Sequence, residues 1–238
     1  MDKILLVTGA SSDIGSELIR NVFQNYEKVL AHYHHWNENL EGLKREAGDK
    51  IIFMQADFSD SNSVTDMICT IKEQGLEPDH IVHFPAPKMK IQKFVKENWA
   101  TFQNGWETSV HSLVEILQAF LPYMQKQKYG KIVLMLTSCT LDTPPKFQAA
   151  YTTVKYAMLG LMKSLAVDYM DKGITVNGVS PDMIQTRFLS ELPEHLIEQY
   201  SEKRPGKRIL TVAEVIPALS FLLSDGADHV SGMNLGVQ

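Results

Sequence analysis

Three side chains in the second half of the sequence have the chemistry to move a proton onto a carbonyl oxygen. Tyr151 and Lys155 are four positions apart, so a helix places them on one face. There the lysine ammonium can stabilise the tyrosine phenolate and lower its pKa, which is about 10 in water. Ser138, thirteen positions before Tyr151, could then hydrogen-bond the oxygen on which negative charge develops. Taken alone, a tyrosine four positions before a lysine is more often a packed ring beside a solvated ammonium.

A second group of residues could bind phosphate. The segment TGASSDIG at residues 8–15 stands between an apolar run and a predicted helix. Such a turn presents backbone N–H groups and the positive end of a helix to a diphosphate, and Gly9 and Gly15 allow close approach. By itself the segment also fits an ordinary β-to-α turn. Asp13 would bring a carboxylate near the diphosphate, and we expect it to cap the helix instead.

Apolar runs alternate along the chain with amphipathic stretches, which is the pattern of βαβ units around a buried parallel sheet. The expected strands are Ile4–Val7, Val29–Ala31, Ile51–Met54, His80–Val82, Lys131–Leu136 and Ile174–Val179. The expected helices include residues 14–23, a long helix over Trp106–Lys126, and one opened by a capping box of Thr211 and Glu214. We predict a single α/β domain over residues 1–238, with a lid or substrate loop at about 182–208.

Composition excludes several classes of protein. The 23 basic residues are outnumbered by 28 acidic ones, giving a net charge of −5, which argues against a nucleic-acid partner. The first apolar run is too short for a secretion signal, and no run approaches the roughly 18 residues of a membrane span. The two cysteines, Cys69 and Cys139, lack metal-site spacing, which favours a reducing cytoplasm.

The order of these motifs resembles the short-chain dehydrogenase/reductase family, and within it most of all the 3-oxoacyl-[acyl-carrier-protein] reductases. The similarity covers essentially the whole chain. It rests on TGASSDIG at 8–15, ADFSD at 56–60, GKIVLMLTS at 130–138, YTTVK at 151–155, GITVNGVSPDMIQT at 173–186 and HVSGMNL at 229–235. The resemblance implies a Rossmann-type fold, a doubly wound parallel sheet of about seven strands with helices on both faces. It also implies a nicotinamide cofactor and a homo-oligomer, either a tetramer or a dimer.

The resemblance also implies roles for individual residues. Tyr151 corresponds to the general acid/base, Lys155 to the residue that lowers its pKa and hydrogen-bonds the nicotinamide ribose, and Ser138 to the serine that polarises the substrate. The other predicted cofactor-binding residues are Gly9, Ser11, Ser12, Ile14 and Gly15 on the phosphate turn, Tyr33, His34 and His35 after the second strand, Asp57 and Phe58 beside the adenine, Pro85 after the fourth strand, and Ile184 and Thr186 beside the nicotinamide amide.

Several residues depart from the family's pattern. Asp13 replaces the middle glycine of TGxxxGxG, and the segment HFPA at 83–86 replaces NNAG. Ser109 aligns with the helix asparagine of the catalytic tetrad, and its shorter side chain is expected to lower turnover. Asp182 follows Pro181 where the family has a glycine. The fifth strand is one residue longer than usual, so Thr137 is the alternative to Ser138.

The choice of cofactor depends on the end of the second strand, His32-Tyr33-His34-His35. A carboxylate there would accept hydrogen bonds from the ribose 2′-hydroxyl, and its absence favours NADP(H) over NAD(H). A zinc site is the other interpretation of these histidines. His32 and His34 share one face, but the sequence shows no obvious third ligand, so no metal is predicted.

These observations together predict an NAD(P)-dependent oxidoreductase that reduces a ketone by hydride transfer, with tyrosine as the general acid. The expected substrate is a 3-oxoacyl thioester, either small or bound to acyl carrier protein. One alternative is a dehydrogenase of a sugar, steroid or secondary-metabolite alcohol, because the fold does not fix the substrate. The other is a non-catalytic binding or regulatory subunit on a Rossmann fold.

Overall fold

A computed structural model describes residues 3–86, 89–189, 192, 194–202 and 204–238. The strands in these ranges are β1 (Ile4–Thr8), β2 (Lys28–Tyr33), β3 (Ile51–Gln55), β4 (His80–His83), β5 (Gly130–Met135), β6 (Ile174–Pro181) and β7 (Asn234–Val237). The α-helices are α1 (Asp13–Val22), α2 (Glu38–Ala47), α3 (Ser61–Glu73), α4 (Trp99–Trp106), α5 (Ser112–Gln127), α6 (Ala149–Asp168), α7 (Glu194–Ser201) and α8 (Val212–Leu223). The six predicted strands are therefore confirmed, and β7 is added to them.

The strands form one parallel sheet in the order β3-β2-β1-β4-β5-β6-β7. Central residues of β1 pair on both sides, as Val7 does with Ala31 of β2 and Val82 of β4. The order reverses direction between β1 and β4, and ligands of open α/β sheets bind beside the carboxyl ends of strands at such a point. The predicted doubly wound sheet of Rossmann type is confirmed.

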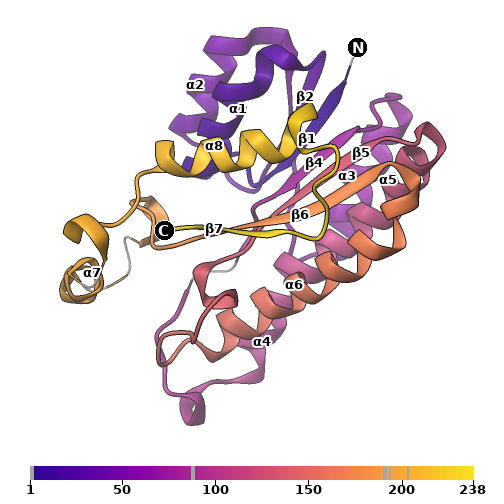
Figure 1. Cartoon of the computed structure of the whole chain (residues 1–238). Helices are drawn as coiled ribbons and strands as arrows, with labels where there is room; N and C mark the ends of the chain where they lie inside the picture. The colour runs from indigo at the N-terminus through magenta and orange to yellow at the C-terminus, as the bar shows by residue number, and fades with distance from the viewer. Residues whose placement is uncertain (1–2, 87–88, 190–191, 193, 203) are drawn as a thin grey trace.

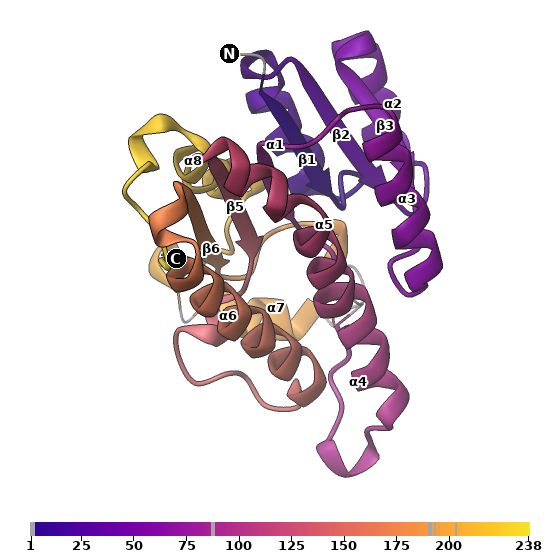
Figure 2. The same ribbon diagram turned by 90° about the vertical axis from the view of Figure 1, so that its right-hand side faces the viewer.

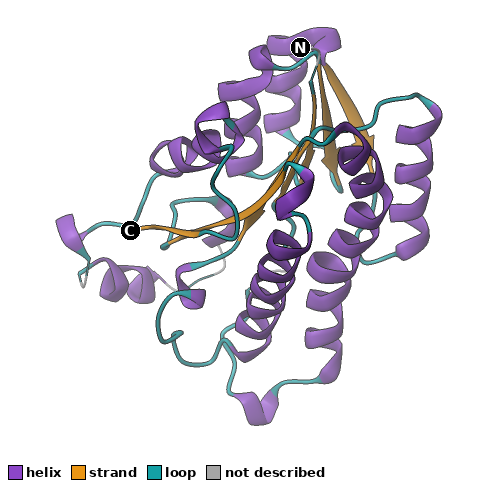
Figure 3. Ribbon diagram, turned by 45° about the vertical axis from the view of Figure 1, so that its right-hand side comes forward, coloured by secondary structure: helices purple, strands orange, loops and turns teal. Residues whose placement is uncertain are grey.

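Helices cover both faces of the sheet (Figure 1, Figure 3). Residues of α3, α5 and α6 pack against side chains such as Leu6, Ile81 and Ile132 in one buried cluster. The opposite face places Val7 and Val133 against α1, α2 and α8 in a second cluster. Because central strands such as β1 and β5 are buried on both faces, their sequences are largely continuous apolar runs instead of alternating ones.

The turn after β1 leads directly into α1. Ser12 is the N-cap residue, since its Oγ accepts a hydrogen bond of 3.0 Å from the Gly15 N–H. Leu18 and Ile19 then fall on the buried face and fix the helix against the sheet. The expectation that Asp13 caps α1 was wrong, because Ser12 already does so and the Asp13 carboxylate has other partners.

The predicted long helix begins earlier than expected. Helix α4 starts at Trp99, a π-helical segment covers Glu107–His111, and α5 continues to Gln127. Figure 2 shows α4 and α5 following one another along the side of the molecule where α6 also lies. Ser109 is fully buried in the π-helical segment, and its Oγ has no hydrogen-bond partner among the described residues. Such segments are frequent at functional sites.

The segment after β6 is partly helical instead of irregular. It contains a short 3₁₀ turn, Arg187–Leu189, followed by α7, which projects from the body of the molecule (Figure 1). Ile184 and Leu210 form a parallel bridge that holds the two ends of the segment together. The predicted capping box is confirmed, since the Glu214 carboxylate accepts a 2.8 Å hydrogen bond from the Thr211 N–H. None of the described helices is long and apolar enough to span a bilayer.

Candidate active site

A cleft of about 710 Å³ lies at the carboxyl ends of β1, β4, β5 and β6, within the range of about 300–1,000 Å³ usual for ligand sites. Most of the predicted site residues line it: Gly9, Ser11, Ser12, Ile14, His34, Asp57, Phe58, Pro85, Ser138, Tyr151, Lys155, Ile184 and Thr186. Three do not. Gly15 lies beneath the phosphate turn, the Tyr33 ring packs edge-on against Trp36, and His35 lies against His34.

The phosphate turn is held in shape by its own hydrogen bonds. Ser12 Oγ donates to the Gly9 carbonyl at 2.8 Å while accepting from Gly15. Gly9 has a φ of +78°, which favours glycine, and a Cβ on Gly15 would lie 2.5 Å from the Gly9 oxygen. The two glycines therefore allow the chain to pack closely in this turn, and the N-terminus of α1 that follows fits the diphosphate of a dinucleotide.

His32 hydrogen-bonds the backbone of this turn. Its Nδ1 accepts from the Gly9 N–H at 3.1 Å, so the neutral ring carries its proton on Nε2 and donates to the Ala56 carbonyl at 3.1 Å. Burial lowers the pKa of His32 to about 4. With both nitrogens engaged, His32 cannot bind a metal, and the described residues contain no group of three or more His, Cys, Asp or Glu that could hold one.

The adenosine end of the cleft is formed by the segment after β3. The Phe58 ring is buried and stacks on His32 with centroids 3.8 Å apart, and Phe58 also lines the cleft. Asp57 accepts two hydrogen bonds from Ser59, which is the main cause of its lowered pKa. The Asp57 carboxylate also lies 3.6 Å from His34 Nε2.

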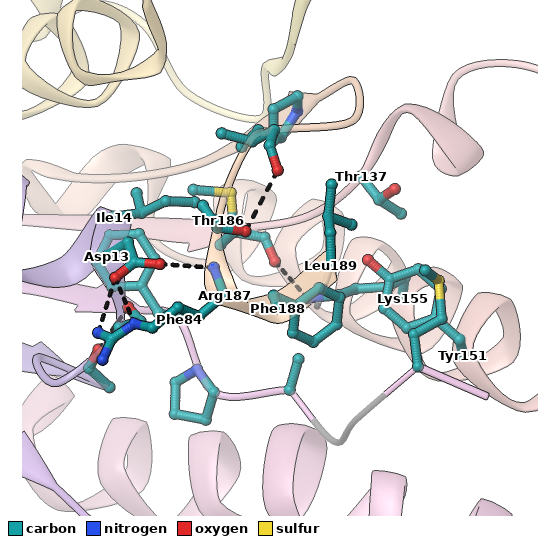
Figure 4. Close-up of a pocket in the computed structure, with 18 of the residues that line it drawn as sticks. Asp13, Ile14, Phe84, Thr137, Tyr151, Lys155, Thr186, Arg187, Phe188 and Leu189 are labelled. Atoms are coloured by element: carbon teal, nitrogen blue, oxygen red, sulfur yellow. Dashed lines mark hydrogen bonds and ion pairs between the residues drawn. The ribbon is translucent and has the colours of Figure 1, made fainter. Parts of the chain in front are cut away.

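The other end of the cleft contains Tyr151 and Lys155, both on α6 as the spacing predicts (Figure 4). Lys155 Nζ donates to the Met135 carbonyl at 2.7 Å and lies 5.9 Å from the centre of the Tyr151 ring. Burial lowers the pKa of Lys155 to about 8, and burial raises that of Tyr151 to about 12. The expectation of a tyrosine pKa below its usual value is therefore wrong, because removal of the phenol from water outweighs the contacts that favour the phenolate. Tyr151 is protonated at neutral pH and ready to act as an acid.

The two neighbouring hydroxyls at the end of β5 have different surroundings. Ser138 Oγ donates to the Asp182 carboxylate at 3.1 Å. Thr137 instead interacts with the Tyr151 side chain, and this contact lowers the tyrosine pKa without cancelling the effect of burial. Thr137, the alternative raised by the length of the strand, therefore remains a candidate for the hydroxyl beside the general acid.

Two ion pairs join the segment after β6 to the walls of the cleft. Arg187 Nη2 lies 2.7 Å from the Asp13 carboxylate, and Arg204 Nε lies 2.6 Å from that of Asp182 (Figure 4 shows the first pair). Between them the segment places the Phe188 ring 6.5 Å from that of Tyr151. The sequence did not lead us to either arginine. The available signal was in their partners, because Asp13 and Asp182 each stand where the family has a glycine.

Buried histidines predict how stability depends on pH. Burial lowers the pKa of His32 to about 4 and of His80 and His83 to about 3. In the unfolded chain these histidines bind a proton near pH 6.5, whereas in the folded chain they do not. The contribution of the neutral histidines to the free energy of unfolding is therefore complete above pH 6.5. It is lost as the pH falls toward their folded-state pKa values of about 4 and 3. Urea unfolding at pH 7, 6 and 5 should show the free energy of unfolding decreasing by up to about 1.4 kcal/mol per pH unit for each histidine.

Matched variants identify the residues responsible for this effect. His83→Asn should reduce the pH dependence, whereas His229→Asn, at an exposed position, should leave it unchanged. A free energy of unfolding that stays constant between pH 7 and pH 5 would contradict the assignment of buried neutral histidines.

Known proteins resemble this chain over nearly its full length. A family model described as enoyl-(acyl carrier protein) reductase matches residues 9–238. A 2-(R)-hydroxypropyl-CoM dehydrogenase of Xanthobacter autotrophicus is 32% identical, over 99% of this chain and 96% of its own. The 3-oxoacyl-[acyl-carrier-protein] reductase FabG of Staphylococcus epidermidis is 27% identical, over 100% and 98%. The solved structure "ElxO with NADP Bound" covers 100% of this chain and 97% of its own, with a TM-score of 0.87 at 23% identity.

These similarities agree with the geometry of the cleft. A glycine turn fits a diphosphate at one end, and a tyrosine and a lysine on one helix face occupy the other. The alternative of a non-catalytic subunit is not supported. The chain is a member of the short-chain dehydrogenase/reductase family, an NAD(P)-dependent oxidoreductase.

Proposed function

We propose that this enzyme reduces the ketone of a 3-oxoacyl thioester. The observation that carries the proposal is the composition of the cleft around Tyr151, where Met183, Phe188 and Leu189 form part of the wall. An acyl chain can bury its methylene groups against these apolar side chains, which are poor hydrogen-bond partners for the hydroxyls of a sugar. The activity named for the staphylococcal relative supports the same substrate class.

The proposed chemistry assigns a task to each side chain. A reduced nicotinamide dinucleotide, held by the phosphate turn and Lys155, would supply the hydride that the carbonyl carbon accepts. Tyr151 donates its phenolic proton to the carbonyl oxygen, and the Thr137 hydroxyl hydrogen-bonds the same oxygen as its charge grows. The Lys155 ammonium, 5.9 Å from the ring centre, stabilises the phenolate that remains. Phe188 and Leu189 exclude water from the reacting atoms.

NADP(H) is the proposed cofactor. The end of β2 offers His34, with a half-exposed side chain, and no carboxylate at residues 32–35. The nearest acid in the cleft wall, Asp57, already accepts hydrogen bonds from Ser59. A ribose 2′-hydroxyl would therefore find no carboxylate at the end of β2, where NAD(H)-specific sites provide one, whereas a 2′-phosphate would meet histidine N–H groups.

A panel of carbonyl substrates tests the substrate class. Oxidation of NADPH is measured with an acetoacetyl thioester, the corresponding free ketone, a sugar ketone and a steroid ketone. The thioester should give a kcat/KM about tenfold or more above the others, because its distant groups add binding energy in the transition state. A higher kcat/KM for the sugar or steroid ketone would overturn the proposed substrate while leaving the reductase assignment intact.

The protein is proposed to work as a homo-oligomer, a dimer or a tetramer. Large apolar side chains are exposed along α6 and α4, where Val167 is 70% and Trp99 is 74% exposed, and Met170 next to α6 is 67% exposed. Monomeric proteins rarely leave such a surface uncovered, and a second copy of the chain would bury it.

Light scattering on size-exclusion fractions tests this assembly. The natural protein should have the mass of two or four chains, and Val167→Glu should shift it toward a smaller species. Thr65→Glu, which adds the same charge at an exposed position on α3, should not. A monomeric natural protein at micromolar concentration would contradict the proposal.

The cytoplasm is the proposed location of the protein. Cys69 and Cys139 are both free thiols in the structure, and Cys69 is exposed, which fits a reducing compartment.

A further inference from the structure

The Asp13 carboxylate is held by several donors at the mouth of the phosphate turn. Arg187 contributes its backbone N–H at 2.8 Å and its Nε at 2.8 Å, and Asn39 contributes its side-chain amide at 3.1 Å. The guanidinium also reaches the turn itself, since Nη2 donates to the Ser11 carbonyl at 3.3 Å. Figure 4 shows this group at the opposite end of the cleft from Tyr151.

The position of Asp13 is electrostatically unfavourable for a nucleotide. Hydrogen bonds from Arg187 keep the pKa of Asp13 below its usual value in spite of partial burial, so the carboxylate is ionised at neutral pH. It follows Ser12 at the first position of α1, the helix end that fits a diphosphate. Two anions would then share one helix N-terminus, and each would weaken the binding of the other.

The position of Arg187 offsets this repulsion. Its side chain is 56% exposed although it contacts Asp13, whose side chain is 24% exposed, so Arg187 places positive charge at the surface of the cleft. Both residues line the cleft together with Ser11 and Ser12. A guanidinium has N–H groups on two edges and can contact a carboxylate and a phosphate at the same time.

We propose that Arg187 is a nucleotide-binding residue of this enzyme: paired with Asp13, it presents its guanidinium to the diphosphate of the bound dinucleotide and compensates the negative charge of Asp13. The pair also fixes the backbone of the 3₁₀ turn that contains Phe188 and Leu189. Arg187 would thus affect both nucleotide binding and the position of Phe188 beside Tyr151. The inference rests on the family's use of NAD(P) and is independent of the ketone substrate.

The test compares NADPH affinity, followed by nucleotide fluorescence, for four forms of the ligand-free full-length protein. These are the natural protein, Arg187→Met, Asp13→Asn and the double variant. Arg187→Met should weaken binding by about tenfold or more, because it removes a charge-assisted contact and leaves Asp13 uncompensated. Asp13→Asn should bind at least as tightly as the natural protein. The double variant should recover most of the affinity that Arg187→Met alone loses.

Controls separate this role from damage to the fold. Arg20→Met removes the ion pair of α1 with Glu46, 3.0 Å at Nε, and should leave NADPH affinity unchanged. Thermal unfolding without nucleotide shows whether each variant is folded. The loss in Arg187→Met should shrink at high salt, where the repulsion between Asp13 and the diphosphate is screened.

The outcomes separate failure of the inference about Arg187 from failure of the NAD(P) assignment. Equal affinity of Arg187→Met and the natural protein would overturn the inference, and so would a double variant that recovers nothing. Tighter binding by both single variants would also overturn it, since the ion pair would then block the site. Failure of the natural protein to bind any nicotinamide dinucleotide would instead contradict its assignment as an NAD(P)-dependent enzyme.

Discussion

Replacement of Tyr151 by phenylalanine is expected to lower kcat by about 10² to 10⁴, the usual contribution of a positioned general acid. The phenol is the proposed proton donor of the cleft, and burial raises its pKa to about 12, so it is protonated at neutral pH. The variant loses one oxygen and no ring contacts. The dissociation constant for NADPH should therefore change by less than about twofold, while thioester-dependent oxidation of NADPH nearly disappears.

A second tyrosine on the same helix provides the control. Tyr156 is 46% exposed, and Tyr156→Phe should leave kcat and NADPH affinity as they are. Substantial turnover by Tyr151→Phe would remove Tyr151 from the role of general acid. Loss of NADPH binding together with turnover would show that the hydroxyl supports the cofactor site instead.

The second large effect is expected at the end of β5. Thr137→Val keeps the shape of the side chain and removes its hydroxyl, so kcat should fall by about 10² to 10³, the cost of losing one donor to a developing oxyanion. Ser138→Ala should have a much smaller effect on kcat, because the Ser138 hydroxyl already donates to Asp182. Thr137→Ser restores the hydroxyl and should recover most of the activity. Steady-state kinetics with an acetoacetyl thioester measure all three.

The two hydroxyl variants distinguish competing assignments. A large loss in Ser138→Ala with little change in Thr137→Val would return the role to Ser138, the residue that the family resemblance favours. The side chain of Asp182 would then have to release the Ser138 hydroxyl when substrate binds. Equal losses in both variants would indicate a shared hydrogen-bond network at the carbonyl oxygen.

Most of the fold could be predicted because its central strands are buried on both faces. The run Ile4–Val7 in β1 is continuously apolar for this reason. The edge strand β7 escaped the periodicity analysis because its sequence, NLGV, is short and only partly buried. The π-helical segment at Glu107–His111 could not be predicted either, since five residues at a slightly wider helical spacing keep the same apolar pattern.

The candidate site was predictable where its residues are close in sequence. Tyr151 and Lys155 needed only a helix, and the phosphate turn needed only a strand followed by a helix. The ion pair of Asp13 with Arg187 joins residues 174 positions apart, and no local pattern encodes such a contact. The choice between Thr137 and Ser138 depends on which hydroxyl faces α6. The sequence leaves this open because it does not fix the residue at which β5 ends.

The central claim is that this chain binds a reduced nicotinamide dinucleotide and transfers its hydride to a ketone. The most direct test is a fluorescence titration of the purified protein with NADPH and with NADH, followed by addition of an acetoacetyl thioester while the absorbance of the reduced nicotinamide is recorded. We expect saturable binding, tighter for NADPH, and loss of that absorbance only after the thioester is added. Absence of binding by either nucleotide at physiological concentrations would contradict the claim.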